Sequence, residues 1–408
     1  MGEGGAVNRQ DHPWRRRALF AVILSANILY GLLNSALSPV LPAMARHFGG
    51  DGILLSQLVI AVAQFGIVLG GFPAGRLADR FGARPVLLAS LVAFSLIGSA
   101  GLYLDNAAAL LAARLLLGMT SVGITTACLA LIASRVAPEL RPRLLGYQTG
   151  IGAGASVGIL LLTGFVGQAA GWRAPFSFYL VSLLVLAIAW YGVPRGQGTG
   201  PAAEKAGNAN FAAALPALLP QLPVYLLLLL LAVVQFSVFL QLPFLVTQEG
   251  LGDLRQVSLV ASTGAAAMAI GAASYGRIQA VLPHWLIAPL VLSAIALGQI
   301  VLFAAPTLPV VVAGALFAEF SAGVLIPHGY ALIVAGAPAS VRATALAVGA
   351  SFFSLGNALN PLVAAPLRAV LGIRGFFTAM GVFLFAITVV IAIVAFARRR
   401  APVEGAAE

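Results

Sequence analysis

Gly71-Phe-Pro-Ala-Gly-Arg-Leu-Ala-Asp-Arg-Phe-Gly-Ala-Arg84 is a charged segment that joins two long apolar runs of the chain, residues 56–75 and 86–104. Each run is long enough to cross the hydrocarbon core of a bilayer as a helix. The segment carries three arginines and one aspartate, and its glycines permit a sharp turn and close approach of neighbouring helices. It therefore predicts a tight, charged turn between two membrane-spanning helices.

The composition of the whole chain agrees with a location in the membrane. Of its 408 residues, 61% are hydrophobic and only 9% are charged, whereas soluble proteins carry about 25% charged residues. The apolar runs are continuous over about twenty residues, which excludes the short alternating strands of a β-barrel. We therefore expect an all-α integral membrane protein that is surrounded by the lipid bilayer.

Twelve apolar runs follow one another along the chain, at residues 18–44, 56–75, 86–104, 107–134, 144–168, 175–193, 221–248, 256–275, 285–305, 308–336, 343–368 and 375–397. A polar stretch rich in glycine and alanine, residues 194–220, separates the first six runs from the last six. The sequence thus predicts twelve transmembrane helices in two six-helix bundles, residues 1–193 and 221–408, joined by a linker.

The two predicted halves repeat each other at an offset near 200 residues. Four short features recur: Gly75-Arg76 as Gly276-Arg277, Gly123 as Gly323, Ala137-Pro138 as Ala337-Pro338, and Gly171-Trp172-Arg173 as Gly372-Ile373-Arg374. The position equivalent to Asp79 is Ala280, so the charged turn is complete in the first half only. This internal repeat predicts two bundles related by a pseudo-twofold axis.

The positions of the lysines and arginines predict the orientation of the bundle. If the N-terminus is cytoplasmic, seventeen of these residues fall on the cytoplasmic side and five on the other, while Arg114 lies inside a span. This asymmetry satisfies the positive-inside rule and places both termini in the cytoplasm. It also accounts for the net charge of +11 without a nucleic-acid partner, because the basic residues are scattered over short loops. The near-exclusive use of arginine over lysine indicates a bacterial source with a GC-rich genome, and hence the bacterial inner membrane.

The charged turn has the form G-x-x-x-G-R-L-x-D-R-x-G-x-R and resembles the signature between spans two and three of the major facilitator superfamily. Ala83 stands where that family usually carries another arginine. The resemblance extends over residues 18–397 and implies transport by alternating access, in which two halves rock about a site near the midplane. It also implies that the turn is a conformational switch formed by Gly71, Gly75, Arg76, Asp79, Arg80, Gly82 and Arg84. In this role Asp79 would fasten the turn against the start of span eleven, near Arg342.

Three ionisable side chains lie inside predicted spans, where charge is costly and function is the default explanation: Arg114, Glu319 and His328. Glu319 lies near the middle of span ten, where a carboxyl could take up a proton from one side of the membrane and release it to the other. We therefore assign Glu319 to proton coupling, with a structural carboxylate paired with an arginine or with hydroxyls as the alternative. His328 lies nine residues further on, half a turn around the helix, which favours a packing role over a proton relay.

Arg114 opens the segment Arg114-Leu-Leu-Leu-Gly118, which is similar to the span-four motif of the superfamily. Leu117 replaces the glutamine that is common there. The resemblance implies that Arg114 takes part in proton transfer or holds an anionic partner. A structural arginine that donates to backbone carbonyls is the alternative.

Span five carries glycines at intervals of four, namely Gly146, Gly150, Gly154 and Gly158. We expect another helix to pack against this glycine stripe. The stripe resembles the antiporter motif of the superfamily, which implies exchange of substrate for protons. Ala155 and Ile159 stand in place of a proline and a glycine of that motif.

Polar and aromatic side chains within the spans indicate a cavity. Asn27, Tyr30 and Asn34 share one face of span one, because they are three and seven residues apart. The resemblance implies that spans one, four, seven and ten line the central cavity. The candidates for substrate binding are Asn27, Tyr30, Asn34, Gln235, Phe236, Phe239 and Asn357, each with interhelical hydrogen bonding as the alternative. Such a cavity is mostly apolar, which suits lipophilic or amphipathic ligands.

We expect a monomeric, proton-coupled exporter of lipophilic or amphipathic compounds. Uptake or export of a specific small metabolite or a siderophore-like compound is the alternative. The sequence does not indicate an enzyme, since it has no P-loop motif and no nucleophile–base constellation. The one lysine, Lys205, lies in the linker, and the one cysteine, Cys128, is expected to be a packing residue. The expected partners are a small-molecule substrate, protons and lipid, with no cofactor and no metal.

Overall fold

The computed structural model describes residues 13–193, 216–338 and 341–400, which form helices and short turns without a strand. The first half contains α1 (Pro13–Ser35), η1 (Ser38–Val40), α2 (Leu41–Phe48), α3 (Gly52–Phe81), α4 (Ala83–Gly98), η2 (Ser99–Leu102), α5 (Ala107–Arg135), α6 (Arg141–Ala170), η3 (Ala174–Leu180) and α7 (Val181–Gly192). The second half contains η4 (Leu219–Gln221), α10 (Leu222–Gln248), α11 (Leu254–Val281), α12 (His284–Ala304), α13 (Leu308–Gly336) and α14 (Arg342–Arg400). Most of the predicted linker and both chain ends lie outside the described residues.

The number of spans agrees with the sequence analysis. Eleven helical segments of the described residues are long and apolar enough to cross a bilayer, and the last of them, Thr344–Ile393, has 50 residues. That length is about twice the 20 residues that one span needs. The backbone leaves the helical conformation at Gly372, where φ is 70° and ψ is 177°. Gly372 therefore divides α14 into two spans, and the predicted twelve-span all-α fold is confirmed.

The repeat between the halves is visible in the conformation of their turns. Gly171, which ends α6, has a φ of 84°, and its counterpart Gly372 has a φ of 70°. Glycine adopts such positive φ values without the steric cost that a side chain would add. Each glycine is followed by an arginine that pairs with an acid: Arg173 with Asp105, and Arg374 with Glu249. The motif found in the sequence is therefore also a structural repeat.

Glycines allow α3 and α5 to touch backbone to backbone. A Cβ atom added to Gly66 would lie 2.0 Å from the carbonyl oxygen of Leu115. One added to Gly118 would lie 2.0 Å from the carbonyl oxygen of Ala63. Since real Cβ atoms do not approach an oxygen so closely, any side chain at these positions would force the helices apart.

The second half makes the same contact between α11 and α13. Here Gly271 meets the backbone of Phe320, and Gly323 meets the backbone of Met268. The internal repeat in the sequence paired Gly323 with Gly123. In the structure, however, the contact of Gly323 with α11 corresponds to that of Gly118 with α3. Gly123 faces the hydroxyl of Ser90 on α4 instead. The closely packed pairs α3–α5 and α11–α13 are thus equivalent in the two halves.

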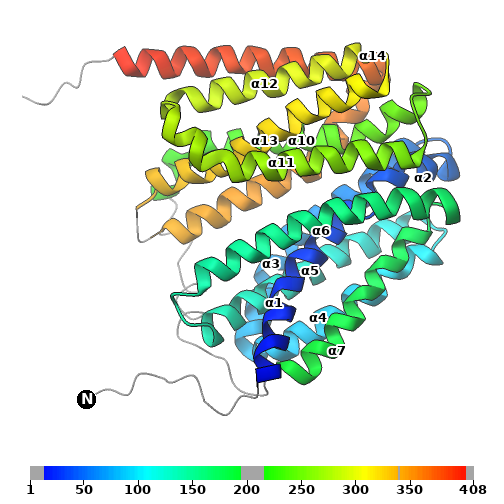
Figure 1. Cartoon of the computed structure of the whole chain (residues 1–408), viewed down its shortest axis with the longest axis vertical. Coiled ribbons are helices and arrows are strands. Elements are labelled where there is room, and N and C mark those ends of the chain that lie inside the picture. The colour runs from blue at the N-terminus through cyan, green and yellow to red at the C-terminus, as the bar shows by residue number, and fades with distance from the viewer. Residues whose placement is uncertain (1–12, 194–215, 339–340, 401–408) are drawn as a thin grey trace, which may run out of the picture.

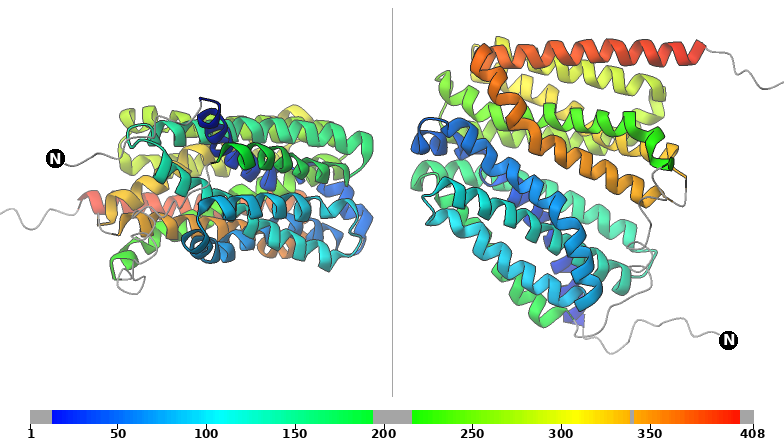
Figure 2. Two further views of the ribbon diagram at one scale, coloured as in Figure 1. Left: turned by 90° about the horizontal axis from the view of Figure 1, so that it is seen from below. Right: turned by 180° about the vertical axis from the view of Figure 1, so that it is seen from behind.

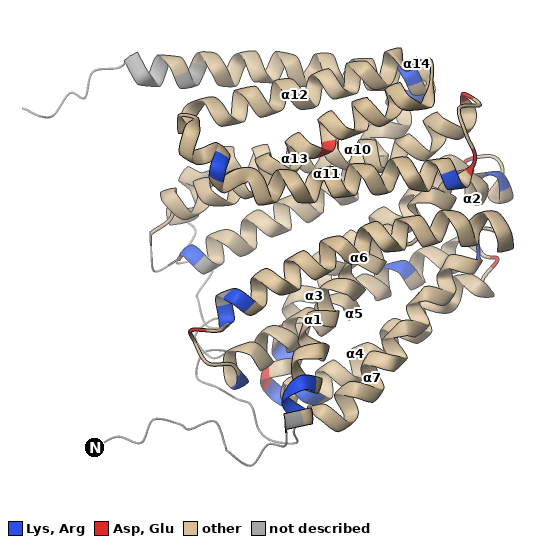
Figure 3. Cartoon of the chain, viewed as in Figure 1, with Lys and Arg blue, Asp and Glu red and all other residues tan. Residues whose placement is uncertain are grey.

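The helices run between two ends of the molecule. We call them the Gly82 end, where α3 passes into α4, and the Gly171 end, where α6 finishes. The halves lie close together at the Gly171 end, beside α2, and their helices diverge toward the Gly82 end (Figures 1 and 2). Charged residues are sparse along the spans and gather near the helix ends (Figure 3).

Direct contacts join the halves toward the Gly171 end. The hydroxyl of Ser38 donates to the carbonyl oxygen of Phe239 on α10 at 3.0 Å. A Cβ atom added to Gly164 of α6 would lie 2.1 Å from the hydroxyl oxygen of Ser258 on α11. This seam closes the molecule on that side.

The glycine stripe of α6 has no helix against it in this conformation. At Gly146, Gly150, Gly154 and Gly158, an added Cβ atom would meet no heavy atom within 4 Å. The packing that we expected for this stripe is therefore absent from the described part of the chain. Gly146 and Gly150 lie in the part of α6 nearest the Gly82 end, where the halves diverge (Figure 1).

Substitution by alanine should have opposite effects on stability at the helix-contact glycines and at the glycines of the α6 stripe. Gly118→Ala forces an overpacked contact with α3, which costs about 1–3 kcal/mol and should lower the melting temperature of the purified protein. Gly146→Ala, the matched control, enters open space and replaces a poor helix former by a good one, so the melting temperature should stay or rise slightly. Thermal unfolding in detergent checks both variants. Equal melting temperatures for the two variants would contradict the packing described.

Candidate functional site

A cavity of about 240 Å³ lies between the two halves of the molecule. The first half contributes residues of α1 and α6, and the second half contributes residues of α10, α11, α13 and α14. Spans one, seven and ten were expected to line it and do so. Span four, which is α5, contributes no residue to this cavity, whereas spans five, eight and eleven do.

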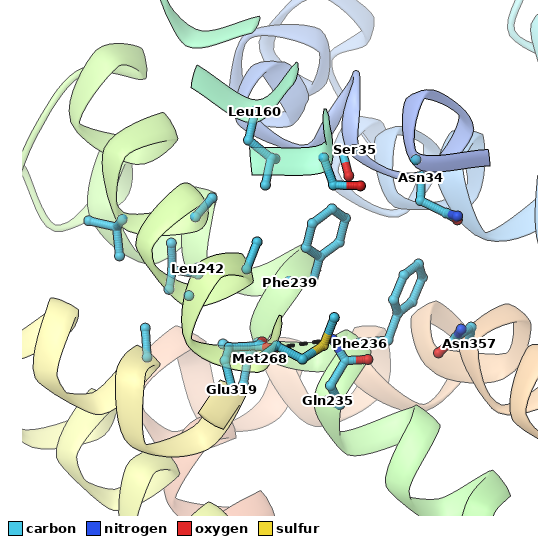
Figure 4. Close-up of a pocket in the computed structure, with 18 of the residues that line it drawn as sticks. Asn34, Ser35, Leu160, Gln235, Phe236, Phe239, Leu242, Met268, Glu319 and Asn357 are labelled. Carbon is cyan, nitrogen blue, oxygen red and sulfur yellow. Dashed lines mark hydrogen bonds between the residues drawn. The ribbon is translucent and has the colours of Figure 1, made fainter. Parts of the chain in front are cut away.

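Glu319 reaches the cavity from the middle of α13 and is only 6% exposed. The side-chain amide of Gln235 on α10 donates to Glu319 Oε2 at 3.3 Å (Figure 4). The same amide nitrogen lies 3.9 Å from the sulfur of Met268 on α11. Gly264 of α11 leaves room for the carboxyl, because a Cβ atom there would lie 3.2 Å from Glu319 Cγ. Three helices of the second half therefore position this acid.

Glu319 has no arginine partner among the described residues. The two ion pairs found there, Asp105 with Arg173 and Glu249 with Arg374, both lie toward the Gly171 end. The structural alternative required an arginine or hydroxyls as partners, and neither bonds Glu319 among the described residues. The acid instead faces a cavity with one amide hydrogen bond.

Aromatic rings form much of the remaining cavity wall. The rings of Phe236 and Phe239 on α10 are stacked, with centroids 5.6 Å apart and planes inclined by 16°. Tyr30 and Phe353 add rings from α1 and α14. Aliphatic and alanine side chains fill most of the spaces between them, including Leu242, so the surface offered to a ligand is predominantly apolar (Figure 4).

Amides supply the polar points on this wall. Asn34 donates to the carbonyl oxygen of Tyr30 at 3.0 Å, and its own side-chain oxygen accepts a hydrogen bond from Gln64. Asn357 lines the cavity from α14, and its Oδ1 atom has no partner among the described residues. An unpartnered amide oxygen facing a cavity is available to a ligand or to water.

The predicted face of α1 is only partly in the cavity. Tyr30 and Asn34 line it, whereas Asn27 does not. Asn27 lies against α6, where a Cβ atom added to Gly152 would come within 2.7 Å of Asn27 Cβ. Its role in this conformation is helix packing.

Arg114 lies outside the cavity and is 1% exposed. Its guanidinium donates to the carbonyl oxygens of Val59 and Leu33, at 2.9 and 3.2 Å, and to the hydroxyl of Tyr179 at 2.9 Å. All three nitrogens are therefore bonded to groups of α1, α3 and η3. This arrangement is the one that the structural alternative predicted for Arg114, and the acidic partner suited to a proton relay is not among its contacts.

His328 also lies away from the cavity, at 1% exposure. Its Nδ1 atom is 3.4 Å from the hydroxyl of Tyr275 on α11, and its ring centroid is 4.8 Å from that of His284. These contacts join α11, α12 and α13. They correspond to the packing role that the sequence favoured.

The charged turn is exposed and lies at the Gly82 end. The guanidinium carbon of Arg76 lies 3.9 Å from the centroid of the Phe72 ring. Arg84 donates a hydrogen bond to the carbonyl oxygen of Trp190 on α7 at 2.7 Å. Asp79 forms no ion pair with Arg342 in the described part of the chain. The role of the turn as a switch stays a prediction.

The sequence analysis missed much of the cavity lining, and Ser35, Gly264 and Met268 are three examples. Gly264 and Met268 belong to span eight, which carries no charged group near them and no motif that we had compared. Ser35 ends α1, and the serine and proline that follow it in Ser38-Pro39 are the signal that this span breaks beside the cavity.

Substitution of Arg114 should lower stability. Arg114→Leu removes the hydrogen bonds that the guanidinium donates to the carbonyl oxygens of Val59 and Leu33, and each hydrogen bond to a charged group is worth about 1.5–3 kcal/mol. Tyr179→Phe removes one of the three partners and should lower the melting temperature less. Thermal unfolding of both variants checks this order. An Arg114→Leu protein with an unchanged melting temperature would contradict the structural role.

Similar sequences are found among bacterial transporters. The 4-hydroxybenzoate transporter PcaK of Pseudomonas aeruginosa is 31% identical over 183 residues, which are 43% of this chain and 39% of that protein. The class H tetracycline resistance protein of Pasteurella multocida is 29% identical over 180 residues, 42% of this chain and 43% of that protein. These matches span about two fifths of the length of the curated relatives.

Solved structures share the fold over nearly the whole chain. A D-xylose–proton symporter superposes with a TM-score of 0.73 at 16% identity, covering 92% of this chain and 97% of that one. A bacterial homologue of the human lysosomal transporter Spinster, in an inward-facing and occupied conformation, superposes with a TM-score of 0.75 at 17% identity, covering 95% and 98%. At these identities the likeness shows the fold alone. The family model described as the Major Facilitator Superfamily matches residues 23–304, more than half of the chain. The protein therefore belongs to the Major Facilitator Superfamily.

Proposed function

We propose that this protein is a secondary active transporter that exports lipophilic or amphipathic small molecules in exchange for protons. The observation that carries the proposal is Glu319, a mid-span carboxyl that lines the cavity between the halves and lacks a cationic partner in the described part of the chain. An ionisable group held at this depth in a membrane protein is costly and is a functional candidate for that reason. It can exchange a proton with whichever side of the membrane the cavity faces.

The distribution of arginines supports an orientation with the Gly82 end in the cytoplasm. The turn and loop residues at that end include Arg76, Arg80, Arg84, Arg141 and Arg143. By the positive-inside rule, the described conformation then opens to the cytoplasm and would load substrate there. In the opposite conformation the halves would close over the glycine stripe of α6 and open at the Gly171 end. We place the protein in a bacterial inner membrane, as a monomer.

The cavity wall supports export of drug-like compounds. It is largely apolar and aromatic, with a few amides that could orient a ligand. Relatives named for resistance to tetracycline and to puromycin, the latter from Streptomyces alboniger, agree with this substrate class. The relative named for 4-hydroxybenzoate favours the alternative, transport of a specific small metabolite.

Proteoliposomes with an imposed pH gradient test the proposal. One pH unit is worth about 1.4 kcal/mol per proton, so one-for-one exchange should accumulate a transported compound about tenfold. Tetracycline, puromycin and 4-hydroxybenzoate form the first panel. Glu319→Gln should abolish this accumulation, because the amide cannot carry a proton, while exchange of labelled for unlabelled substrate continues.

Glu249→Gln is the matched control for this experiment. Glu249 is partly exposed and pairs with Arg374 outside the cavity, and such surface pairs contribute about 0–1 kcal/mol. Accumulation should therefore survive this substitution. Undiminished uphill transport by Glu319→Gln would refute the assigned role, and failure of every compound to accumulate would refute the transport class.

A further inference from the structure

The cavity carries an unbalanced charge. Apart from the Tyr30 phenol, Glu319 is the only ionisable side chain among the described residues that line it, and these residues include no arginine, lysine or histidine. The buried arginine of the first half, Arg114, is occupied by Val59, Leu33 and Tyr179. A ligand in this cavity therefore meets one acid and no base.

Glu319 is also incompletely bonded. Its one hydrogen bond comes from Gln235 at 3.3 Å, longer than the usual N–H···O distance, and it reaches only Oε2. A carboxylate in a low-dielectric site is stabilised by a cation and by several donors. The described side chains supply neither, so an ionised Glu319 needs a positive partner from outside them, either a proton or a cationic group that enters the cavity.

The aromatic wall favours the same kind of ligand. Phe236 and Phe239 are stacked on the helix that carries Gln235, and Tyr30 and Phe353 lie around the same space. The faces of aromatic rings attract cations, and their area buries apolar groups. A cation with aromatic or other lipophilic substituents satisfies both features at once. The negative charge of an aromatic carboxylate would instead be repelled by that of Glu319.

We propose that the cavity selects lipophilic monocations and that Glu319 is the group that recognises their charge. This inference rests on the proposed transport function and narrows its substrate class. It separates this protein from the similar 4-hydroxybenzoate transporter, whose named substrate is an aromatic acid.

Two probes of nearly equal size and opposite charge test the selectivity: tetraphenylphosphonium and tetraphenylborate. Binding of each to the purified full-length protein is measured in detergent, and Glu319→Gln measures the part that depends on the carboxylate. We expect the phosphonium ion to bind the unchanged protein at least about tenfold more tightly than it binds Glu319→Gln. Tetraphenylborate should bind no more tightly to the unchanged protein than to the variant.

Glu319→Asp keeps the experiment decisive if the glutamine variant is poorly folded. The aspartate retains the negative charge on a shorter side chain, so phosphonium binding should remain within about tenfold of that of the unchanged protein. Equal binding of the phosphonium ion by the unchanged protein and a folded Glu319→Gln variant overturns the proposal. So does tetraphenylborate binding that requires Glu319.

The failure of this inference is distinct from a failure of the transport function. If a neutral or anionic compound accumulates in proteoliposomes under a proton gradient while the phosphonium ion does not bind, the charge selectivity is wrong and transport stands. If nothing accumulates and the phosphonium ion does not bind, both are wrong.

Discussion

Backbone polar groups inside a hydrocarbon layer must find hydrogen-bond partners within the protein, and the first span is where this requirement shapes the site. The helix of that span ends at Ser35 and resumes only at η1 and α2, which leaves carbonyl groups at the break without helical partners. Arg114 donates a hydrogen bond to the carbonyl oxygen of Leu33, and Thr163 donates one to the carbonyl oxygen of Ala36. The break can therefore persist, and it holds Asn34 and Ser35 at the cavity wall.

A second constraint comes from the glycine contacts within each half. At Gly66 with Gly118, and at Gly271 with Gly323, the backbones touch so closely that sliding of one helix past the other would bring Cα atoms and carbonyl oxygens into collision. These contacts therefore restrict sliding within the pairs α3–α5 and α11–α13. The glycines of the α6 stripe, by contrast, have no neighbouring atoms within 4 Å of an added Cβ atom.

Much of the fold, but less of the site, follows from local sequence. Apolar runs of about twenty residues predicted the twelve spans, since length and hydropathy are properties of each segment alone. Glu319 was predicted for a similar reason, because an acid in mid-span is conspicuous. The position of Arg114 against the broken end of α1, and that of Met268 beside Glu319, depend on which helices meet. Residue spacing describes one helix face and carries no information about its neighbour.

The single carboxyl among the described residues of the cavity has an electrical consequence for the proposed transport cycle. One carboxylate balances one positive charge, whether a proton or a monovalent cation, so the loaded cavity has the same net charge in both cases. Exchange of one for the other then moves no net charge across the bilayer. Moving one elementary charge across the membrane changes the free energy by about 2.3 kcal/mol per 100 mV of membrane potential. An electroneutral cycle gains no free energy from the membrane potential. Such a protein would depend on the pH difference across its membrane and be insensitive to voltage.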